Sequence, residues 1–232
     1  SKSLYYTVRH DDKISKIDYQ IKKFKDNAIF HFCHAFADAS NKRIFSKYNF
    51  NSYYEMTLFI IEFCSKNNVP LYLKLHPTRY TYISEQIYNR SLKKCLEMHS
   101  KNNSNFYYEL IEDRFNNEQI TKLKNVVAVT GRGTSSIECG FLRIKIINLY
   151  NNFENFSFNY NLNNLDKFGV LVEQLRNRKK LNLDQNYQDA LKLEAVFQLI
   201  SEERLFEFKT ISRSTGTQRA LKNKFLENGY KV

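Results

Sequence analysis

Residues 126–149 limit the possible folds of this chain more than any other stretch. They begin with an apolar run, Val126 to Val129, which breaks at a segment containing two glycines. A second apolar run at 144–149 follows after only a short interval. Short apolar runs of this kind are typical of buried strands, and small residues between them are typical of a turn into a helix. The pattern therefore predicts a compact strand–helix–strand unit with parallel strands.

The turn of this unit has the composition of an anion-binding site. Gly131 and Gly133 let the backbone approach a ligand closely, and Thr134, Ser135 and Ser136 supply hydroxyl donors. The first N–H groups of a helix also favour negative charge, most simply a phosphate. Neither the dinucleotide fingerprint nor the P-loop spacing is present. The simpler alternative is a helix N-cap with a tight turn.

Strands and helices are expected to alternate along most of the chain. Strands are predicted at 28–32 and 71–75, and helices at 53–66, 82–99, 118–123, 164–176 and 187–200, with an irregular loop at 151–164. Amphipathic helices are also predicted at 13–25 and after Ser212. Such alternation argues for an α/β fold in which helices cover both faces of a parallel sheet. The predicted organisation is a linker or helix at 1–26 from a missing upstream domain, a Rossmann-like domain at 27–200 and a helical tail at 201–232.

Composition and charge narrow the choice of partners. The 232 residues carry a formal net charge of +12, which favours anionic partners such as nucleotides, nucleic acid, anionic polysaccharide or a membrane surface. The charge is dispersed and no nucleic-acid motif is present, so we expect no nucleic-acid partner. The four cysteines are widely spaced in apolar surroundings, which predicts reduced core residues in a cytosolic protein and no zinc site. No run approaches the length of a membrane span, and no signal peptide is present.

Three predicted loops carry polar side chains to the same edge of the sheet, because ligands bind beyond the carboxyl ends of parallel strands. These loops lie at 34–38, 76–79 and 130–136, and the last also contains Arg132. Together they bring two histidines, one aspartate, two arginines and several hydroxyls to one place. We consider that convergence more informative than any single loop.

Individual residues of these loops have both functional and structural interpretations. His76, held by the proline that follows it, can donate to a phosphate oxygen, and Lys74 and Arg79 can add charge. The alternative is a turn with a solvated histidine. His34 and Asp38 are candidates for catalysis, although a histidine at a strand end is commonly structural. Glu138 is placed to accept ribose hydroxyls, or else only complements the helix N-terminus.

In their order along the chain, these motifs resemble the bacterial capsule and surface polysaccharide biosynthesis glycosyltransferases. The resemblance rests on His34-Ala-Phe-Ala-Asp38-Ala, Tyr53-Tyr54-Glu55, Leu73-Lys74-Leu75-His76-Pro77 and Gly133-Thr134-Ser135-Ser136-Ile137-Glu138. It covers residues 28–149, about half the chain, and falls in the C-terminal, nucleotide-binding half of a GT-B fold. Two positions depart from the family pattern. Arg132 lies where smaller residues are usual, and Arg143-Ile144 stands where Lys-Pro is common.

The resemblance implies transfer of a sugar from a nucleotide-activated donor to a growing capsular or surface polysaccharide. The donor phosphates would lie on His76 and on the helix start at 134–136, and the ribose on Glu138. No metal or other cofactor is expected, because the helix dipole, histidine and arginine would take the charge of the leaving phosphate. The acceptor would be polysaccharide or lipid-linked. The general base would come from a missing N-terminal GT-B domain, so the chain is expected to be a fragment that is inactive alone.

The resemblance also implies a location in the bacterial cytoplasm, with peripheral contact at the inner face of the inner membrane as an open possibility. Two alternatives to glycosyl transfer remain. A CDP-glycerol-type glycerophosphotransferase shares the His-Pro and Ser/Glu arrangement but takes a different donor. A non-catalytic module that binds anionic polymers through the +12 charge would differ in being strongly salt-sensitive.

Overall fold

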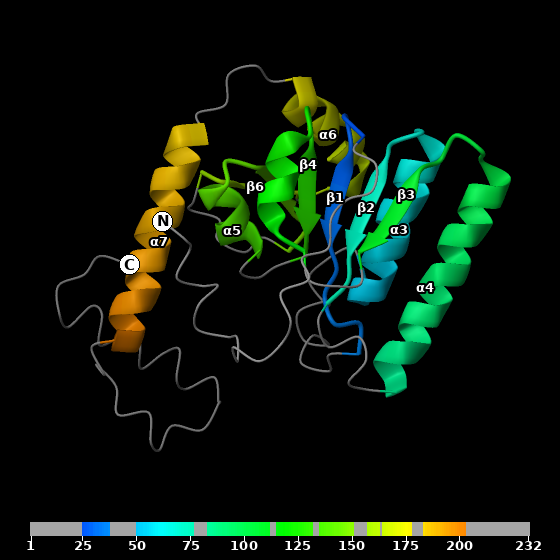
Figure 1. The fold of residues 1–232 in the computed structure, drawn as a ribbon, viewed down its shortest axis with the longest axis horizontal. Coiled ribbons are helices and arrows are strands. Elements are labelled where there is room, and N and C mark those ends of the chain that lie inside the picture. Colours follow the sequence, from blue (N-terminus) through cyan, green and yellow to red (C-terminus); the bar gives the residue numbers. More distant parts are fainter. Residues whose placement is uncertain are drawn as a thin grey trace. The chain divides into compact units, whose positions relative to one another are not determined.

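The computed structural model in Figure 1 describes residues 25–37, 50–76, 83–111, 115–131, 135–150, 157–162, 164–177 and 183–202. The chain divides into two compact units, Ser1–Leu191 and Lys192–Val232. The sheet and the candidate site belong to the first unit. The predicted helices at 13–25 and after Ser212 lie outside the described residues, apart from Lys25.

The first unit is built on a six-stranded sheet in the order β3-β2-β1-β4-β5-β6. Its strands are β1 (Ile29–Phe32), β2 (Leu71–Lys74), β3 (Tyr108–Ile111), β4 (Val127–Thr130), β5 (Lys145–Asn148) and β6 (Asn159–Asn161). Every pair of neighbours is parallel. This strand order is that of the doubly wound nucleotide-binding folds, whose direction of winding reverses between the first and fourth strands. The predicted Rossmann-like fold is therefore confirmed.

The helices follow the predicted positions closely. They are α3 (Tyr53–Lys66), α4 (Ile83–Asn102), α5 (Ser135–Phe141), α6 (Phe168–Asn177) and α7 (Leu183–Glu202), with 3₁₀ helices η3 (Asn117–Lys122) and η4 (Leu165–Lys167). The start of α3 is fixed by reciprocal capping. The Ser52 hydroxyl accepts from the Glu55 amide at 3.1 Å, and the Glu55 carboxylate accepts from the Asn51 amide at 2.6 Å. These two bonds satisfy backbone N–H groups at the start of the helix that would otherwise lack partners.

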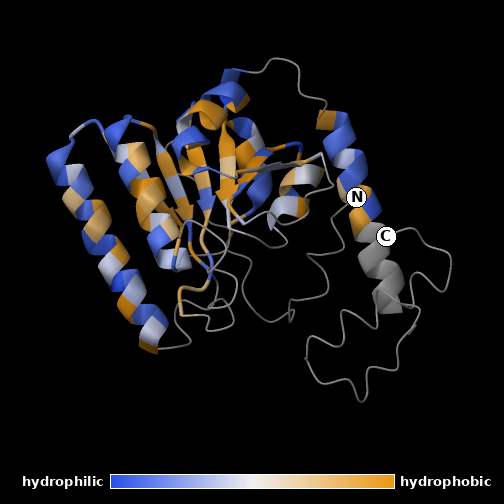
Figure 2. Cartoon of the chain, turned by 180° about the vertical axis from the view of Figure 1, so that it is seen from behind, coloured by the Kyte–Doolittle hydropathy of each residue, from blue (hydrophilic) through white to orange (hydrophobic). Residues whose placement is uncertain are grey.

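Each face of the sheet packs on its own apolar cluster. Successive residues of β1 belong to opposite faces of the sheet: Ile29 is part of one cluster and Phe30 is part of the other. The first cluster takes its helical residues from α3, α4 and α6, and the second includes Ile120 of η3 and Cys139 of α5. Helices thus cover both faces, as predicted, and Figure 2 shows the strands as the most apolar layer between them.

All four cysteines are free thiols. Cys33, Cys64 and Cys139 are buried, and Cys95 is half-buried. Burial raises the pKa of the thiol at each of the four positions. They behave as small apolar core residues, as their surroundings in the sequence predicted.

Two strands, β3 and β6, were not predicted from the sequence. β3 contains Glu109 and Tyr108, and β6 is a three-residue strand within the segment that was predicted as an irregular loop. Both occupy edges of the six-stranded sheet, where one side of the strand pairs with no other strand in the described segments. Polar residues are tolerated there, so the apolar run that marks a central strand is missing.

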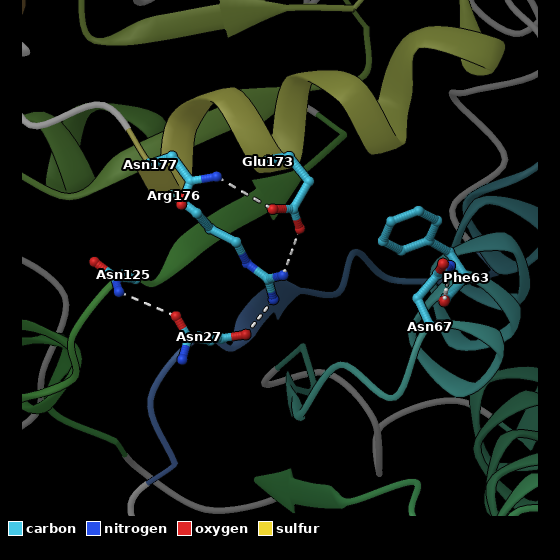
Figure 3. A network of polar contacts seen from close by, with 7 residues as sticks. All are labelled: Asn27, Phe63, Asn67, Asn125, Glu173, Arg176 and Asn177. Atoms are coloured by element: carbon cyan, nitrogen blue, oxygen red, sulfur yellow. Dashed lines mark hydrogen bonds and ion pairs between the residues drawn. The ribbon is translucent and has the colours of Figure 1, made fainter.

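The amino edge of the sheet is closed by asparagine turns. Asn27, Asn68 and Asn125 have φ of 56°, 54° and 55°, and each lies shortly before a strand. Asparagine tolerates this left-handed conformation better than most residues. The side-chain amide of Asn125 donates to Asn27 Oδ1 at 3.0 Å, and the Arg176 guanidinium donates to the backbone carbonyl of Asn27 (Figure 3). Arg176 also pairs with Glu173 at 3.0 Å.

Candidate functional site

The three loops that the sequence singled out follow three adjacent strands. β2, β1 and β4 are neighbours, and all three end at the lower edge of the sheet in Figure 1. The reversal of winding lies between β1 and β4, and open parallel sheets bind ligands in the crevice at that point. The strand ends that precede the three loops therefore lie side by side at the carboxyl edge of the sheet.

His34, which follows β1, is held by residues of two other elements. Its Nε2 lies 3.3 Å from the Thr130 hydroxyl at the end of β4. Its ring stacks on the Tyr53 ring with a centroid distance of 4.1 Å and an angle of 17° between the planes. Because the hydrogen bond fixes one edge of the imidazole and the stack fixes one face, His34 has a defined orientation across the β1–β4 boundary.

A glycine permits the aromatic packing behind His34. Tyr53 and Tyr150 meet edge to face at 5.4 Å, and both are buried. A Cβ on Gly131 would lie 2.7 Å from a Tyr53 ring atom and 2.8 Å from a Tyr150 ring atom. Only a residue without a side chain fits there, since such contacts are well inside van der Waals distance. The structural role of Gly131 is thus to admit the two rings.

The loop after β1 is anchored to α4 by a buried carboxylate. Glu85, in the first turn of α4, accepts from the Phe36 amide at 2.9 Å and from the Ala37 amide at 2.8 Å. Two successive backbone N–H groups converging on one carboxylate are strong, charge-assisted donors. The contact holds the segment that carries His34 and leads toward Asp38, which lies outside the described residues.

A second polar group at this edge lies on the opposite face of the sheet. The Lys74 ammonium donates to Asn117 Oδ1 at 2.9 Å and lies over the rings of Phe32 and Phe115, at 5.5 Å and 5.8 Å from their centroids. Burial lowers the pKa of Lys74, and the negative charge of Glu138 acts against that shift. Burial raises the pKa of the Glu138 carboxyl, with Lys74 and Asn117 acting in the opposite direction. Lys74, Asn117 and Glu138 therefore form one coupled polar cluster.

The hydroxyl residues at the start of α5 differ from one another. Ser135 is half-buried, whereas Ser136 is fully buried and its hydroxyl accepts from the Asn148 amide at 3.4 Å. Asn148, at the end of β5, also accepts from the Tyr150 amide at 2.9 Å. Ser136 is thus tied to β5, and Ser135 is the more exposed of the two hydroxyls.

The remaining predicted site residues have the following positions. His76 is half-buried and lies two residues beyond β2, at the same edge. Glu138 lies in the first turn of α5. Arg79, Arg132, Gly133 and Thr134 lie outside the described residues, as does Asp38. Their predicted roles stay predictions.

Sequence reasoning named Tyr53 within the motif at 53–55 but not as the platform for His34, and it missed three further residues that organise this edge: Tyr150, Glu85 and Asn117. Tyr53 and Glu85 both sit in the first turn of a helix that follows a strand-end loop, which is a usable signal in a parallel sheet. Asn117 lies 43 positions from Lys74, and nothing local in the sequence connects them.

No group of three or more His, Cys, Asp or Glu side chains that could hold a metal ion occurs among the residues described above. In the same parts of the chain, no helix has the length and apolar character needed to cross a membrane.

Fold and site geometry define a Rossmann-like α/β domain with a polar and aromatic cluster at the reversal of its winding. No family model and no curated protein matches the sequence. Among solved structures, two of UDP-GlcNAc 2-epimerase from Methanocaldococcus jannaschii align with part of the chain, one of them in complex with UDP-GlcNAc and UDP.

For the complex with UDP-GlcNAc and UDP, the identity is 17%, the TM-score is 0.41, and the alignment covers 73% of this chain and 46% of the epimerase. For the other structure the values are 18%, 0.43, 75% and 45%. The chain thus spans less than half the length of these enzymes. The alignments are too loose to assign an activity, and the fold assignment rests on the strand order of the sheet itself.

Proposed function

We propose that the carboxyl edge between β1 and β4 binds the nucleotide part of an activated sugar, and that the chain is the donor-binding half of a glycosyltransferase of surface polysaccharide synthesis. The observation that carries the proposal is the cluster of His34, Tyr53, Thr130 and Gly131 at the reversal of the winding. The motif resemblance, which spans residues 28–149, supports the same conclusion independently of side-chain geometry.

The chemistry proposed for this edge is electrostatic. A departing nucleotide gains negative charge on its phosphate, and groups already oriented toward that position lower the barrier without further reorganisation. His34 is oriented by Tyr53 and Thr130, and His76 lies at the end of the adjacent strand. The proposal assigns phosphate contact to the two histidines and Ser135, and ribose contact to Glu138. Activation of the acceptor hydroxyl is assigned to a second domain.

The test is a thermal-shift panel of the 232-residue chain with CMP, CDP, UDP, GDP and CDP-glycerol. A ligand that binds only the folded state stabilises it by about 2.7 kcal/mol at 100 times its dissociation constant. We expect one nucleotide base to raise the melting temperature in the parent. A response confined to CDP-glycerol would instead favour glycerophosphotransfer.

Paired variants locate the binding. His34→Gln and Glu138→Gln should abolish the shift, whereas the matched changes His99→Gln and Glu62→Gln, near the C-terminal end of α4 and on the exposed side of α3, should leave it intact. The melting temperature without ligand separates lost binding from lost folding. If no nucleotide acts while anionic polymers stabilise the chain in a salt-sensitive manner, the binding-module alternative replaces the proposal.

A further inference from the structure

The outward face of α4 carries a continuous stripe of apolar and cationic side chains. Its members, spaced three or four residues apart, are Ile83, Ile87, Arg90, Lys94, Met98 and Lys101. At 100° per residue they fall within an arc of about 80°, and the helix rises about 27 Å from the first to the last. The buried residues of the same helix, Glu85, Asn89, Leu92 and Leu96, lie on the opposite side.

The three apolar members are unusually exposed. Ile83 is 77% exposed, Ile87 60% and Met98 52%. They account for half of the large apolar side chains classed as exposed in the described ranges. Scattered single residues of this kind are ordinary, but three on one line of one helix form a face that no other described element covers. Figure 2 shows α4 on the flank of the sheet, with polar and apolar residues alternating along its length.

The cationic side chains of the stripe restrict the class of partner that this face can bind. Arg90, Lys94 and Lys101 are exposed, and none forms an ion pair within the described part of the chain. The stripe contains no acidic residue, and Glu97 lies on its flank. The whole chain carries a formal net charge of +12, so the positive charge of the stripe has the same sign as that of the molecule.

An anionic lipid surface fits this combination better than a protein does. The buried centre of a protein interface is depleted of lysine, because the ammonium would lose its water without a partner. On a bilayer, a helix lying in the interface buries apolar side chains among the acyl chains, while Lys and Arg reach the phosphates with their stems in apolar surroundings. Each cation near an anionic leaflet adds to the attraction.

We propose that the Ile83–Lys101 stripe of α4 docks this domain on the surface of an anionic phospholipid bilayer. The inference is independent of the proposed nucleotide site. Ile83 and Ile87 lie at the start of α4, which follows the carboxyl end of β2. Docking through the stripe would therefore place the carboxyl edge of the sheet near the lipid headgroups.

The experiment is cosedimentation of the full chain with phosphatidylcholine vesicles that contain or lack phosphatidylglycerol. The parent should bind only the anionic vesicles, and added salt should weaken the binding. The double variant Ile83→Ser/Ile87→Ser should lower the partition coefficient about tenfold or more, although it leaves the charge unchanged. Val170→Ser, which removes an exposed apolar residue from α6, is the matched control and should bind like the parent.

A charge-matched pair separates the stripe from the general basicity of the chain. Arg90→Glu/Lys94→Glu and Lys66→Glu/Lys122→Glu change the net charge equally, and all four residues are exposed. Only the first pair should lower the partition coefficient about tenfold or more. Equal losses for both pairs, equal binding to neutral vesicles, or no vesicle binding by the parent would overturn the proposal. Capture of an acidic amphipathic peptide in place of vesicles would assign the stripe to a protein partner.

Discussion

The two edges of the sheet use their polar residues in different ways, although they terminate the same strands. At the amino edge, Asn27, Asn125, Arg176 and Glu173 bond to one another and close the turns (Figure 3). At the carboxyl edge, His34 is oriented by stacking and by one hydrogen bond, and Gly131 admits the rings behind it. The first arrangement stabilises the fold, whereas the second, under the proposed function, positions groups that contact the nucleotide. Substitutions at the amino edge should therefore be detected by measurements of stability, and substitutions at the carboxyl edge by measurements of nucleotide binding.

The largest effect is expected from His31, which lies in β1 between the two edges. Its Nδ1 donates to the Val129 carbonyl at 3.1 Å, its Nε2 lies 3.0 Å from the Thr57 hydroxyl, and burial lowers its pKa to about 4. Because the pKa in the folded chain is below the unfolded value, the unfolded state takes up the proton first. Stability is fully present above about pH 6.5 and is lost as pH falls toward about 4, by up to about 3 kcal/mol.

This prediction is measured as the free energy of unfolding in urea at about pH 7.5 and about pH 4.5. His31→Gln should remove that share of the pH dependence and leave the share due to carboxylates. Because His31 lies in β1 between the two edges, unfolding at low pH should disrupt both edges in a single transition. A parent and a variant with the same pH dependence would contradict the assignment.

The next largest effect is expected from Gly131→Ala at the carboxyl edge. The new Cβ would lie 2.7–2.9 Å from ring atoms of Tyr53 and Tyr150, which are buried and cannot turn away. We expect a loss of about 1–3 kcal/mol in stability through overpacking, and at least about tenfold weaker nucleotide binding through displacement of the Tyr53 platform. Urea unfolding and nucleotide titration measure the two effects.

Gly169→Ala is the matched control for that substitution. Its Cβ meets Phe63 at 3.2 Å, and the gain in helix propensity within α6 opposes this milder crowding. The net change should stay below about 1 kcal/mol, with nucleotide binding unaffected. Equal behaviour of the two alanine variants would remove the steric argument for Gly131.

At the amino edge, Arg176→Met should reduce stability without changing nucleotide binding. It removes the donor to the Asn27 carbonyl and the ion pair with Glu173 while it keeps the apolar stem. The expected loss is about 1–2 kcal/mol, set by the carbonyl left without its partner. Urea unfolding gives the loss, and a nucleotide titration serves as the control. Weakened binding in a fully folded variant would erase the distinction between the edges.

The smallest expected effect compares Asn125→Ala with Asn125→Gly. Both variants lose the bond to Asn27, but only alanine is strained at φ 55°. The alanine variant should therefore be about 1 kcal/mol less stable than the glycine variant. Thermal unfolding of the two proteins measures the difference. Equal stabilities would show that the left-handed backbone contributes nothing at this turn.

The sequence by itself determined the central elements of the fold. Apolar runs located β1, β2, β4 and β5 to within a residue or so, and α3 was predicted at its observed bounds. The sequence also predicted that three polar loops follow the carboxyl ends of strands. These predictions were possible because buried parallel strands, amphipathic helices and turns each have a local sequence pattern. The edge strands β3 and β6 lack that pattern, since solvent on one side relaxes the demand for apolar residues.

Only the tertiary structure decided how the site is assembled. The contact of His34 with Thr130 spans 96 positions, and that of Lys74 with Asn117 spans 43. Stacking of His34 on Tyr53 and the anchoring of the 33–37 loop by Glu85 likewise depend on where α3 and α4 pack. Such pairings follow from sheet order and helix packing, which arise from the whole chain. The sequence therefore predicted which residue types lie at the carboxyl edge, whereas the tertiary structure determined which of these residues are in contact.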